Sequence, residues 1–352
     1  MRNPTCIHPV VGIDVGTKKS QIAIVLADCE PESFSIQTTS VAFQEFFSRR
    51  VFTRIVLEAG GSSAWIARLL GSMGHHVVVV DSRQSGLKHL VQQKTDKNDA
   101  AALAFLALSP RLLREVRHAP EEIESDRALL DYRTKIVSQR TSLVNFTRGK
   151  LTSLGIRVPS GSTEAFPRRA APLVPEGLSD TLELALRRIS ELTAEISKID
   201  RMVARMLERY PVAEILQTIH GVGPIISARF ILRVFDPARF SKNRQVGSYL
   251  GLTPRIHQSG DRSAHNGITK AGDREMRRLL VQAAHRALGN SAPDSDIKRF
   301  GLSIAGRGGK NAKGRAVVAV ARRLAVLMLS MWKSGEAWEP LRIDRQRNSS
   351  AA

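Results

Sequence analysis

The stretch VVGIDVGTKKSQIAIVLA, residues 10–27, decides the fold of the first third of the chain. Two apolar runs rich in Val and Ile flank a short polar segment around Gly16 and Thr17, which predicts two strands joined by a tight turn. Asp14 ends, or nearly ends, the first run. An acidic side chain at this place suits two chemistries, holding a metal ion against nucleic acid or sitting beneath the phosphates of a nucleotide.

Further strands and helices alternate after this pair. They are the strand-like runs 33–40, 54–60 and 76–81 and the helical runs 41–50 and 62–74. Three early strands followed by strand and helix in alternation predict a mixed sheet covered by helices, which is the order of ribonuclease-H-like domains. We therefore predict an α/β domain over residues 1–115.

The middle of the chain carries a heptad seam. Its apolar positions alternate in steps of three and four residues: Leu182, Ala185, Ile189, Leu192, Ile196, Ile199, Val203 and Met206. A second helical segment, 122–154, is interrupted by Arg133 and Arg140, and a proline-containing turn region at 155–177 separates the two segments. Because regular seams bury against another helix, we predict an antiparallel coiled-coil arm over 116–210 that dimerises; an ordinary spacer is the alternative.

The segment 211–340 predicts a second, mainly helical domain, followed by a disordered tail at 341–352. In LQTIHGVGPIISARFILRV, residues 216–234, Gly221 and Gly223 lie between two helical runs. This pattern is typical of helix-hairpin-helix elements, in which turn amides contact a phosphate. A glycine-rich turn between packed helices is the alternative interpretation.

The charge of the chain indicates a polyanionic partner. There are 53 Lys and Arg against 33 Asp and Glu, a net charge of +20 in 352 residues. Nucleic acid is the leading partner of such a protein. The most apolar late stretch, 316–332, carries Arg322 and Arg323 at its centre and is shorter than the roughly 20 residues of a membrane span, so we expect no membrane association. Because Cys6 and Cys29 are the only cysteines and no secretory segment is present, we expect a reducing, cytoplasmic setting.

Four carboxylates form the candidate metal site. Asp14 and Glu58 lie at or near the ends of predicted strands, and Asp96 and Asp99 share one face at the start of a helix. Four carboxylates at one place would repel one another, and divalent cations would relieve that repulsion. Mg²⁺ prefers oxygen ligands, and one or two ions would assist phosphodiester transfer. For the helical pair alone, a helix start favoured by the dipole is the alternative.

Taken in order, these motifs resemble the transposases of insertion sequence one-ten type, also called bridge-RNA-guided recombinases, from Val11 to about Gly335. The resemblance rests on Asp14, LEAGG with Glu58, KTDKNDA, GVGP, YLGLTP, Ser259–Gly260, GITKAGD and the tail AVVAVARRLAVLML. The chain departs from the family in AGGSSAW, where Thr or Gly-Tyr usually follows the glutamate, and in HGVG, which replaces Pro-Gly-Ile-Gly.

The resemblance implies a RuvC-like domain with a DEDD metal site and a transposase domain whose serine, here Ser259, attacks a DNA phosphate to form a transient phosphoserine link. It also implies a structured noncoding guide RNA that pairs with donor and target DNA, and a homodimer that assembles to a tetramer. The residues alone do not select this serine over Ser241, Ser248 or Ser263. His257 is a candidate base, and an exposed loop histidine is the alternative.

The serine lies in the stretch 249–280, which predicts a glycine-rich polar loop and then a basic amphipathic helix. We predict that four basic residues here contact phosphates, with a solvated helix face as the alternative: Lys270, Arg274, Arg277 and Arg278. The glycine-rich, basic stretch 301–315 is expected to be mobile without nucleic acid.

Three other functions are compatible with parts of the sequence. They are a metal-dependent, structure-selective endonuclease without a covalent intermediate, a non-catalytic nucleic-acid-binding protein, and a sugar-kinase-like phosphotransferase. DVGTKKSQIAIV resembles the phosphate-binding hairpin of the actin and sugar-kinase superfamily, but the sequence offers no second Asp-Gly hairpin. The family resemblance implies a site-specific DNA recombinase of a mobile element, and this is the function we expect.

Overall fold

The computed structural model describes residues 9–26, 30–50, 54–81, 95–109, 115–259 and 262–342, and for 256–259 and 262–266 the backbone alone. Two compact units divide the chain, residues 1–119 and 120–352. Each unit has hydrophobic cores of its own. In the described part of the chain, no helix is long and apolar enough to cross a membrane.

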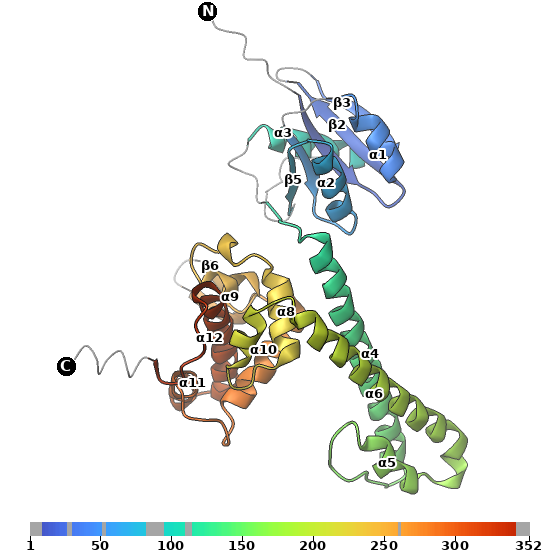
Figure 1. The fold of residues 1–352 in the computed structure, drawn as a ribbon, viewed down its shortest axis with the longest axis vertical. Helices are drawn as coiled ribbons and strands as arrows, with labels where there is room; N and C mark the ends of the chain where they lie inside the picture. The colour runs from blue at the N-terminus through green and yellow to red at the C-terminus, as the bar shows by residue number, and fades with distance from the viewer. Residues whose placement is uncertain are drawn as a thin grey trace, which may run out of the picture. The chain divides into compact units, whose positions relative to one another are not determined.

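The first unit is built on a sheet with five described strands (Figure 1). They are β1 (Val10–Val15), β2 (Lys19–Val25), β3 (Glu32–Gln37), β4 (Arg54–Glu58) and β5 (Val77–Val80). The strand order is β3-β2-β1-β4-β5; β1, β2 and β3 are antiparallel neighbours, whereas β4 is parallel to both β1 and β5. Residues 10–25 thus form the predicted strand pair within a mixed sheet.

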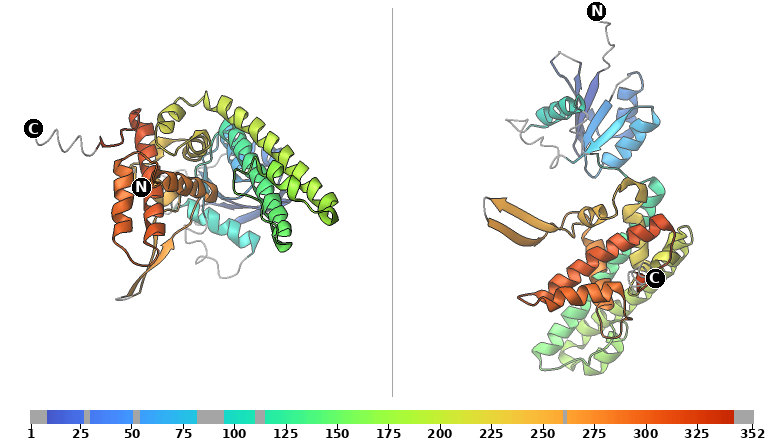
Figure 2. Two further views of the ribbon diagram at one scale, coloured as in Figure 1. Left: turned by 90° about the horizontal axis from the view of Figure 1, so that it is seen from below. Right: turned by 90° about the vertical axis from the view of Figure 1, so that its left-hand side faces the viewer.

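Helices cover both faces of this sheet, with α3 on the side opposite to α1 and α2 (Figure 2). They are α1 (Ser40–Phe47), α2 (Ser63–Ser72) and α3 (Asp96–Ala107). Successive strand residues point to opposite faces. Ile13 and Leu57 therefore join the core under α1 and α2, whereas Val10 and Val56 join the core under α3.

Helix α3 contacts β1 backbone to backbone at Gly12. A Cβ at this position would lie 2.1 Å from the carbonyl oxygen of Ala100 and 2.2 Å from the amide nitrogen of Ala104. Both alanines are fully buried, so small residues on the helix and a glycine on the strand produce the close approach together. The alanine-rich run after KTDKND therefore forms a helix whose small side chains allow its backbone to approach the sheet closely.

The second unit begins with the arm, an antiparallel pair of long helices (Figure 1). They are α4 (Glu121–Ser153) and α6 (Ser179–Leu207), and the segment between them contains the short helix α5 (Phe166–Ala170). All eight predicted seam positions of α6 are buried. They share cores with α4 residues, among them Leu130, Ile136, Val144 and Leu151. The seam is filled by a helix of the same chain, so its regularity does not indicate dimerisation.

The arginines that interrupt the seam of α4 have acidic partners. Arg133 donates to Asp200 of α6 at 2.5 Å, and Arg140 forms an ion pair with Glu164 at 3.3 Å. Arg140 also donates to Thr193 of α6. Two largely buried arginines, each paired with a more exposed carboxylate, therefore complete the packing of α4 where apolar residues are missing.

The C-terminal part of the second unit is a helical body that shares one core with the base of the arm. Its helices are α7 (Val212–Gln217), α8 (Pro224–Val234), α9 (Gln245–Tyr249), α10 (Arg274–Ala287), α11 (Asp296–Gly306) and α12 (Ala312–Ser334). The predicted arm and the predicted C-terminal domain thus lie in one compact unit.

Two stretches that we predicted to be irregular are ordered. The polar stretch after α9 forms an antiparallel hairpin of β6 (Pro254–Ser259) and β7 (Arg262–Ile268), which projects from the helical body (Figure 2). The stretch 301–315, expected to be mobile, forms the end of α11 and the start of α12. Arg315 donates to the carbonyl oxygens of Gly308 and Lys310 at 2.6 and 2.5 Å, which holds the connection between the two helices.

Replacing Gly12 by alanine should separate α3 from the sheet, because the new Cβ would overlap backbone atoms that have no alternative position. We expect Gly12→Ala to lower the free energy of unfolding by about 1–3 kcal/mol, measured by urea denaturation. Gly71→Ala in α2 is the matched control, since a Cβ there meets nothing within 4 Å. Equal stability of the two variants would contradict the close contact.

Candidate active site

The first two candidate carboxylates lie at adjacent strand ends. Ile13 of β1 is paired with Leu57 of β4, so Asp14 and Glu58 are the next residues along two neighbouring parallel strands. Both are half-buried. They stand two residues after Gly12 and Val56 respectively, and alternation therefore places them on the face that α3 covers.

Helix α3 runs back along this face. Near its C-terminal end, the Ala107 carbonyl oxygen accepts a hydrogen bond of 2.8 Å from Arg54 Nη1, at the start of β4. Midway, the helix contacts Gly12 through Ala104. Its first turn, with Asp96 and Asp99, therefore extends toward the strand ends that carry the other two carboxylates. We call this end of the α3 face, with its four carboxylates, the carboxylate edge.

The first turn of α3 is a regular capped helix start. Thr95 is the N-cap, and its Oγ1 accepts a hydrogen bond of 3.2 Å from the Asn98 amide. Asp96 is exposed and Asp99 is half-buried. Acidic residues in this turn are favoured by the helix dipole. The cap orients the turn, whatever the two carboxylates bind.

The donor set of the carboxylate edge suits a hard cation such as Mg²⁺, because all four ligands are carboxylate oxygens. The side chains do not form a ready coordination shell: among the residues described, no three His, Cys, Asp or Glu converge closely enough to hold a metal ion. Metal binding would therefore need side-chain movement, which the exposure of Asp96 permits.

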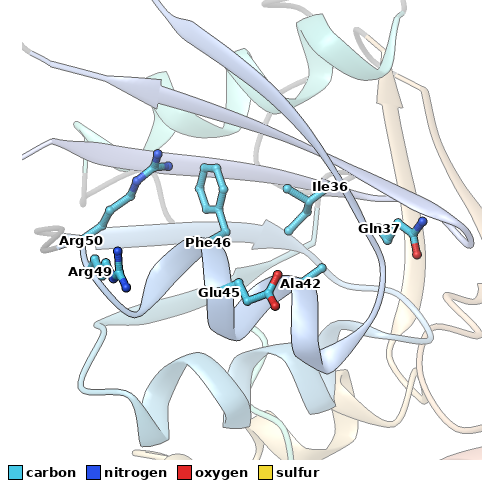
Figure 3. A pocket seen from close by; sticks show the side chains of 7 residues that line it. All are labelled: Ile36, Gln37, Ala42, Glu45, Phe46, Arg49 and Arg50. Carbon is cyan, nitrogen blue, oxygen red and sulfur yellow. The ribbon is translucent and has the colours of Figure 1, made fainter.

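A pocket of about 590 Å³ lies elsewhere in the first unit (Figure 3). Its lining residues come from the end of β3 and from α1 and the residues just after it: Ile36, Gln37, Ala42, Glu45, Phe46, Arg49 and Arg50. The Arg50 guanidinium carbon stands 3.9 Å from the Phe46 ring centroid. Because α1 and α3 cover opposite faces of the sheet, this pocket is separate from the carboxylate edge.

The candidate nucleophile lies on the hairpin of the second unit. Ser259 is the last residue of β6, and its backbone is paired with Arg262 of β7. The side chains of Ser259, His257 and Ser263 lie outside the described part of the structure. The competing Ser241 is described, and its hydroxyl is 3.3 Å from Gln245 Oε1.

Two glycines hold the base of this hairpin. Gly251 and Gly272 have φ of 67° and 74°, and a Cβ would lie 2.1 Å from the Ala271 oxygen in the first case and 2.3 Å from the Tyr249 oxygen in the second. The motifs YLGLTP and GITKAGD therefore meet backbone to backbone, which explains why both contain glycine. This contact fixes where the serine-bearing hairpin leaves the helical body.

The four basic residues predicted to contact phosphates differ in their surroundings. Lys270 and Arg274 are exposed. Arg277 Nη1 donates to the carbonyl oxygens of Leu250 and Ala271 at 3.1 and 2.5 Å, and partial burial lowers the pKa of this arginine. Arg278 is paired with Glu275 on the same helix. Arg277 is thus already used to hold the hairpin base, a role that the sequence analysis missed.

The glycines of GVGP form a tight turn between α7 and α8. Gly221 has φ of 89°, and a Cβ there would lie 3.1 Å from the Ala283 oxygen of α10. Gly223 is the N-cap of α8, and a Cβ at Gly223 would meet nothing within 4 Å. Gly221 therefore allows the turn to pack against α10, whereas no atom of the described residues covers the Cβ direction of Gly223 at the start of α8.

The chain matches known transposases in both units. Residues 11–156 match the family model of the DEDD transposase of IS110 type, described as Transposase, and residues 213–298 match the model described as Transposase IS116/IS110/IS902 family. The putative transposase y4pF/y4sB of Sinorhizobium fredii is 30% identical over 299 residues, 84% of this chain and 76% of that protein. The chain belongs to the IS110/IS116 transposase family.

Other members of the family are similar over comparable lengths. The transposase for insertion sequence element IS1111A of Coxiella burnetii is 29% identical, over 81% of this chain and 79% of that protein. A probable family 20 transposase of Pseudomonas aeruginosa is 27% identical, over 72% and 77%. This transposase is therefore an enzyme that acts on DNA. The carboxylate edge falls in one matched segment and Ser259 in the other.

Replacing Gly251 by alanine should distort the hairpin base, because this backbone conformation strains any residue with a side chain and the Cβ would overlap the backbone of Ala271. We expect Gly251→Ala to lower the free energy of unfolding of the second unit by about 1–3 kcal/mol. Gly314→Ala, at an open position of α12, is the control and should be neutral or slightly stabilising. Comparable unfolding curves for both variants would contradict the close backbone contact between Gly251 and Ala271.

Proposed function

We propose that this transposase is an RNA-guided, site-specific recombinase of a mobile insertion element. It cleaves and rejoins DNA through a phosphoserine link at Ser259, with Mg²⁺ at the carboxylate edge. The observation that carries the proposal is the placement of Asp14, Glu58 and the first turn of α3 at one end of one face of the sheet.

The strand order supports a ribonuclease-H-like, RuvC-like fold for the first unit. Three antiparallel strands are followed by two parallel ones in the order β3-β2-β1-β4-β5, with helices on both faces. In this arrangement the first strand is central, and its neighbour β4 ends beside it. The acidic residues of the two strands therefore reach a common edge, as a metal-dependent phosphodiester site needs.

The carboxylates of this edge would hold one or two Mg²⁺ ions. Bound there, the ions would neutralise charge on a DNA phosphate and on its attacking and leaving oxygens. Asp14 and Glu58 would supply ligands from strands, and Asp96 and Asp99 would supply them from a capped helix start. Because all four residues lie on regular elements, the rearrangement that metal binding requires is limited to side chains.

The serine step is balanced without any further reactant. The Ser259 Oγ–P bond forms as a P–O bond of one DNA strand breaks; the serine proton leaves, and the released DNA oxygen takes up a proton. Attack by a hydroxyl of another strand then reverses the exchange and frees the serine. Because one phosphoester replaces another, strand rejoining needs no nucleotide hydrolysis. We propose that Ser259 and the carboxylate edge, of the same or different subunits of a tetramer, act on one phosphate.

The charge distribution supports a nucleic-acid partner for the second unit. Residues 120–352 contain 39 Lys and Arg against 23 Asp and Glu, whereas residues 1–119 contain 14 against 10. Most of the excess of basic over acidic residues therefore lies in the unit that carries Ser259. Cations contact the nucleic-acid backbone without reading sequence, so site choice by base pairing to a guide RNA suits this composition.

A metal-dependent endonuclease without a covalent intermediate is the second candidate. It is favoured by the fact that the carboxylate edge alone would suffice for hydrolysis by water. The two functions differ in whether a serine is joined to DNA, which is directly measurable.

The covalent step should depend on the serine and the metal site in different ways. We expect Ser259→Ala to abolish denaturation-resistant protein–DNA adducts and strand cleavage, while DNA affinity stays within about twofold, because a neutral hydroxyl adds little to backbone binding. Asp14→Asn should slow cleavage by a factor of about 100 or more, because the metal site loses a charged ligand. Adducts are quantified by gel electrophoresis with end-labelled DNA. Cleavage that persists without Ser259 but requires Asp14 would establish the endonuclease instead.

Guidance by RNA should be visible in the purified protein. When the chain is expressed together with the DNA that flanks its gene, we expect a structured noncoding RNA to copurify, with loops complementary to the element end and the target. Site-selective cleavage should disappear after ribonuclease treatment and return when the RNA is added back. Selectivity that is unchanged by ribonuclease would exclude guidance by RNA.

A further inference from the structure

An ion-pair network lies where the chain leaves the hairpin and enters α10. Asp273, directly after Gly272, is the N-cap of α10, and its Oδ1 accepts a hydrogen bond of 3.0 Å from the Met276 amide. Its Oδ2 accepts from Arg229 of α8, at 3.1 Å from Nε and 3.0 Å from Nη2. The Asp273 side chain is only 9% exposed, so this carboxylate depends on its protein partners.

Arg229 also reaches the arm. Its Nη1 donates to Asp131 Oδ1 of α4, and the Asp131 side chain is 63% exposed. The Arg229 side chain itself is only 14% exposed. Burial alone would lower the pKa of this arginine, but the two carboxylates raise it above its ordinary value. One guanidinium therefore joins α8, the arm and the start of α10.

The network and the glycine contact act on the same short segment. Residues 269–272 follow β7, and they carry the backbone that Gly251 and Tyr249 contact on the β6 side. Asp273 ends this segment and anchors it to α8. Strand β7 thus continues into a segment whose far end is held by Arg229, and the residues that precede β6 contact the same segment.

We infer that Arg229 is a positioning residue for the serine, which holds the hairpin base against α8 and the arm so that Ser259 meets the DNA phosphate in one orientation. This inference rests on the proposed role of Ser259. Arg229 touches no reacting atom. It acts through Asp273 and the segment 269–272, and it makes the direction of the hairpin depend on the position of α4.

Lysine cannot reproduce this arrangement. The planar guanidinium of Arg229 donates from Nε to one carboxylate, with Nη2 3.0 Å from the same oxygen, and donates from Nη1 to another. A lysine ammonium is a single charge on a flexible chain, and it would satisfy one carboxylate at a time. Arg229→Lys therefore keeps the positive charge and most of the packing, but it weakens the simultaneous contact with Asp273 and Asp131. Asp131→Asn breaks only the contact to the arm, at an exposed position.

The test compares Arg229→Lys and Asp131→Asn with Arg299→Lys, a control that alters the surface ion pair to Asp294. Adduct formation is followed at saturating DNA, and DNA affinity is measured separately. We expect Arg229→Lys to slow adduct formation about tenfold or more, Asp131→Asn to slow it by a smaller factor, and affinity to stay unchanged, because misplacement of a reacting group affects the rate rather than binding.

A second readout does not depend on catalysis. Limited trypsin digestion of the same variants in a Ser259→Ala background reports how firmly the hairpin is held, through cleavage at Arg255, Arg262 and Lys270 identified by mass spectrometry. Arg229→Lys should accelerate cleavage at these sites relative to Arg299→Lys. Unchanged digestion together with an unchanged adduct rate would overturn the inference, as would equal losses in the control. If the unaltered protein forms no adduct, the proposed function fails, and the digestion still decides whether Arg229 holds the hairpin.

Discussion

Helix α3 can lie directly on β1 because Gly12 has no side chain, and the arrangement of the carboxylate edge depends on that contact. The helix then runs along the sheet with its C-terminal end held by Arg54 and its first turn at the ends of β1 and β4. A side chain at Gly12 would lift the aspartates of α3 away from Asp14 and Glu58. The position of a possible metal site thus follows from one backbone contact in a buried layer.

In the second unit, polar and backbone contacts at the base of the hairpin position the candidate nucleophile. The hairpin is held at its base by two glycines in the left-handed region, by Arg277 on backbone carbonyls, and by the pair of Arg229 with Asp273. Polar and backbone contacts set direction more sharply than apolar packing does, because hydrogen bonds require both distance and angle. The arm shares the core of the helical body. The hairpin, the body and the base of the arm therefore belong to one compact unit.

Sequence patterns predicted the parts of the fold that are dominated by a single periodicity. Two apolar runs rich in Val and Ile in residues 10–27 predicted β1 and β2, and every predicted seam position of α6 is buried. The predicted antiparallel pairing of the two arm helices is present, since α4 of the same chain packs on the seam. A heptad pattern does not specify whether a further helix binds, so dimerisation of the arm stays a prediction. The hairpin was missed because polar residues and glycines hide its alternation. That the four carboxylates act together at one edge stays a prediction, because convergence of side chains is a tertiary property that no local pattern specifies.

The proposed mechanism requires the carboxylate edge of the first unit and the serine of the second unit to act on the same phosphate. The most direct test is a cryo-electron microscopy structure of the DNA-loaded assembly with Mg²⁺. The account predicts one DNA phosphate that lies next to residue 259 of one subunit and, through metal, next to Asp14 and Glu58 of the same or another subunit. Carboxylates that contact no phosphate near residue 259 in any pairing of subunits would contradict it.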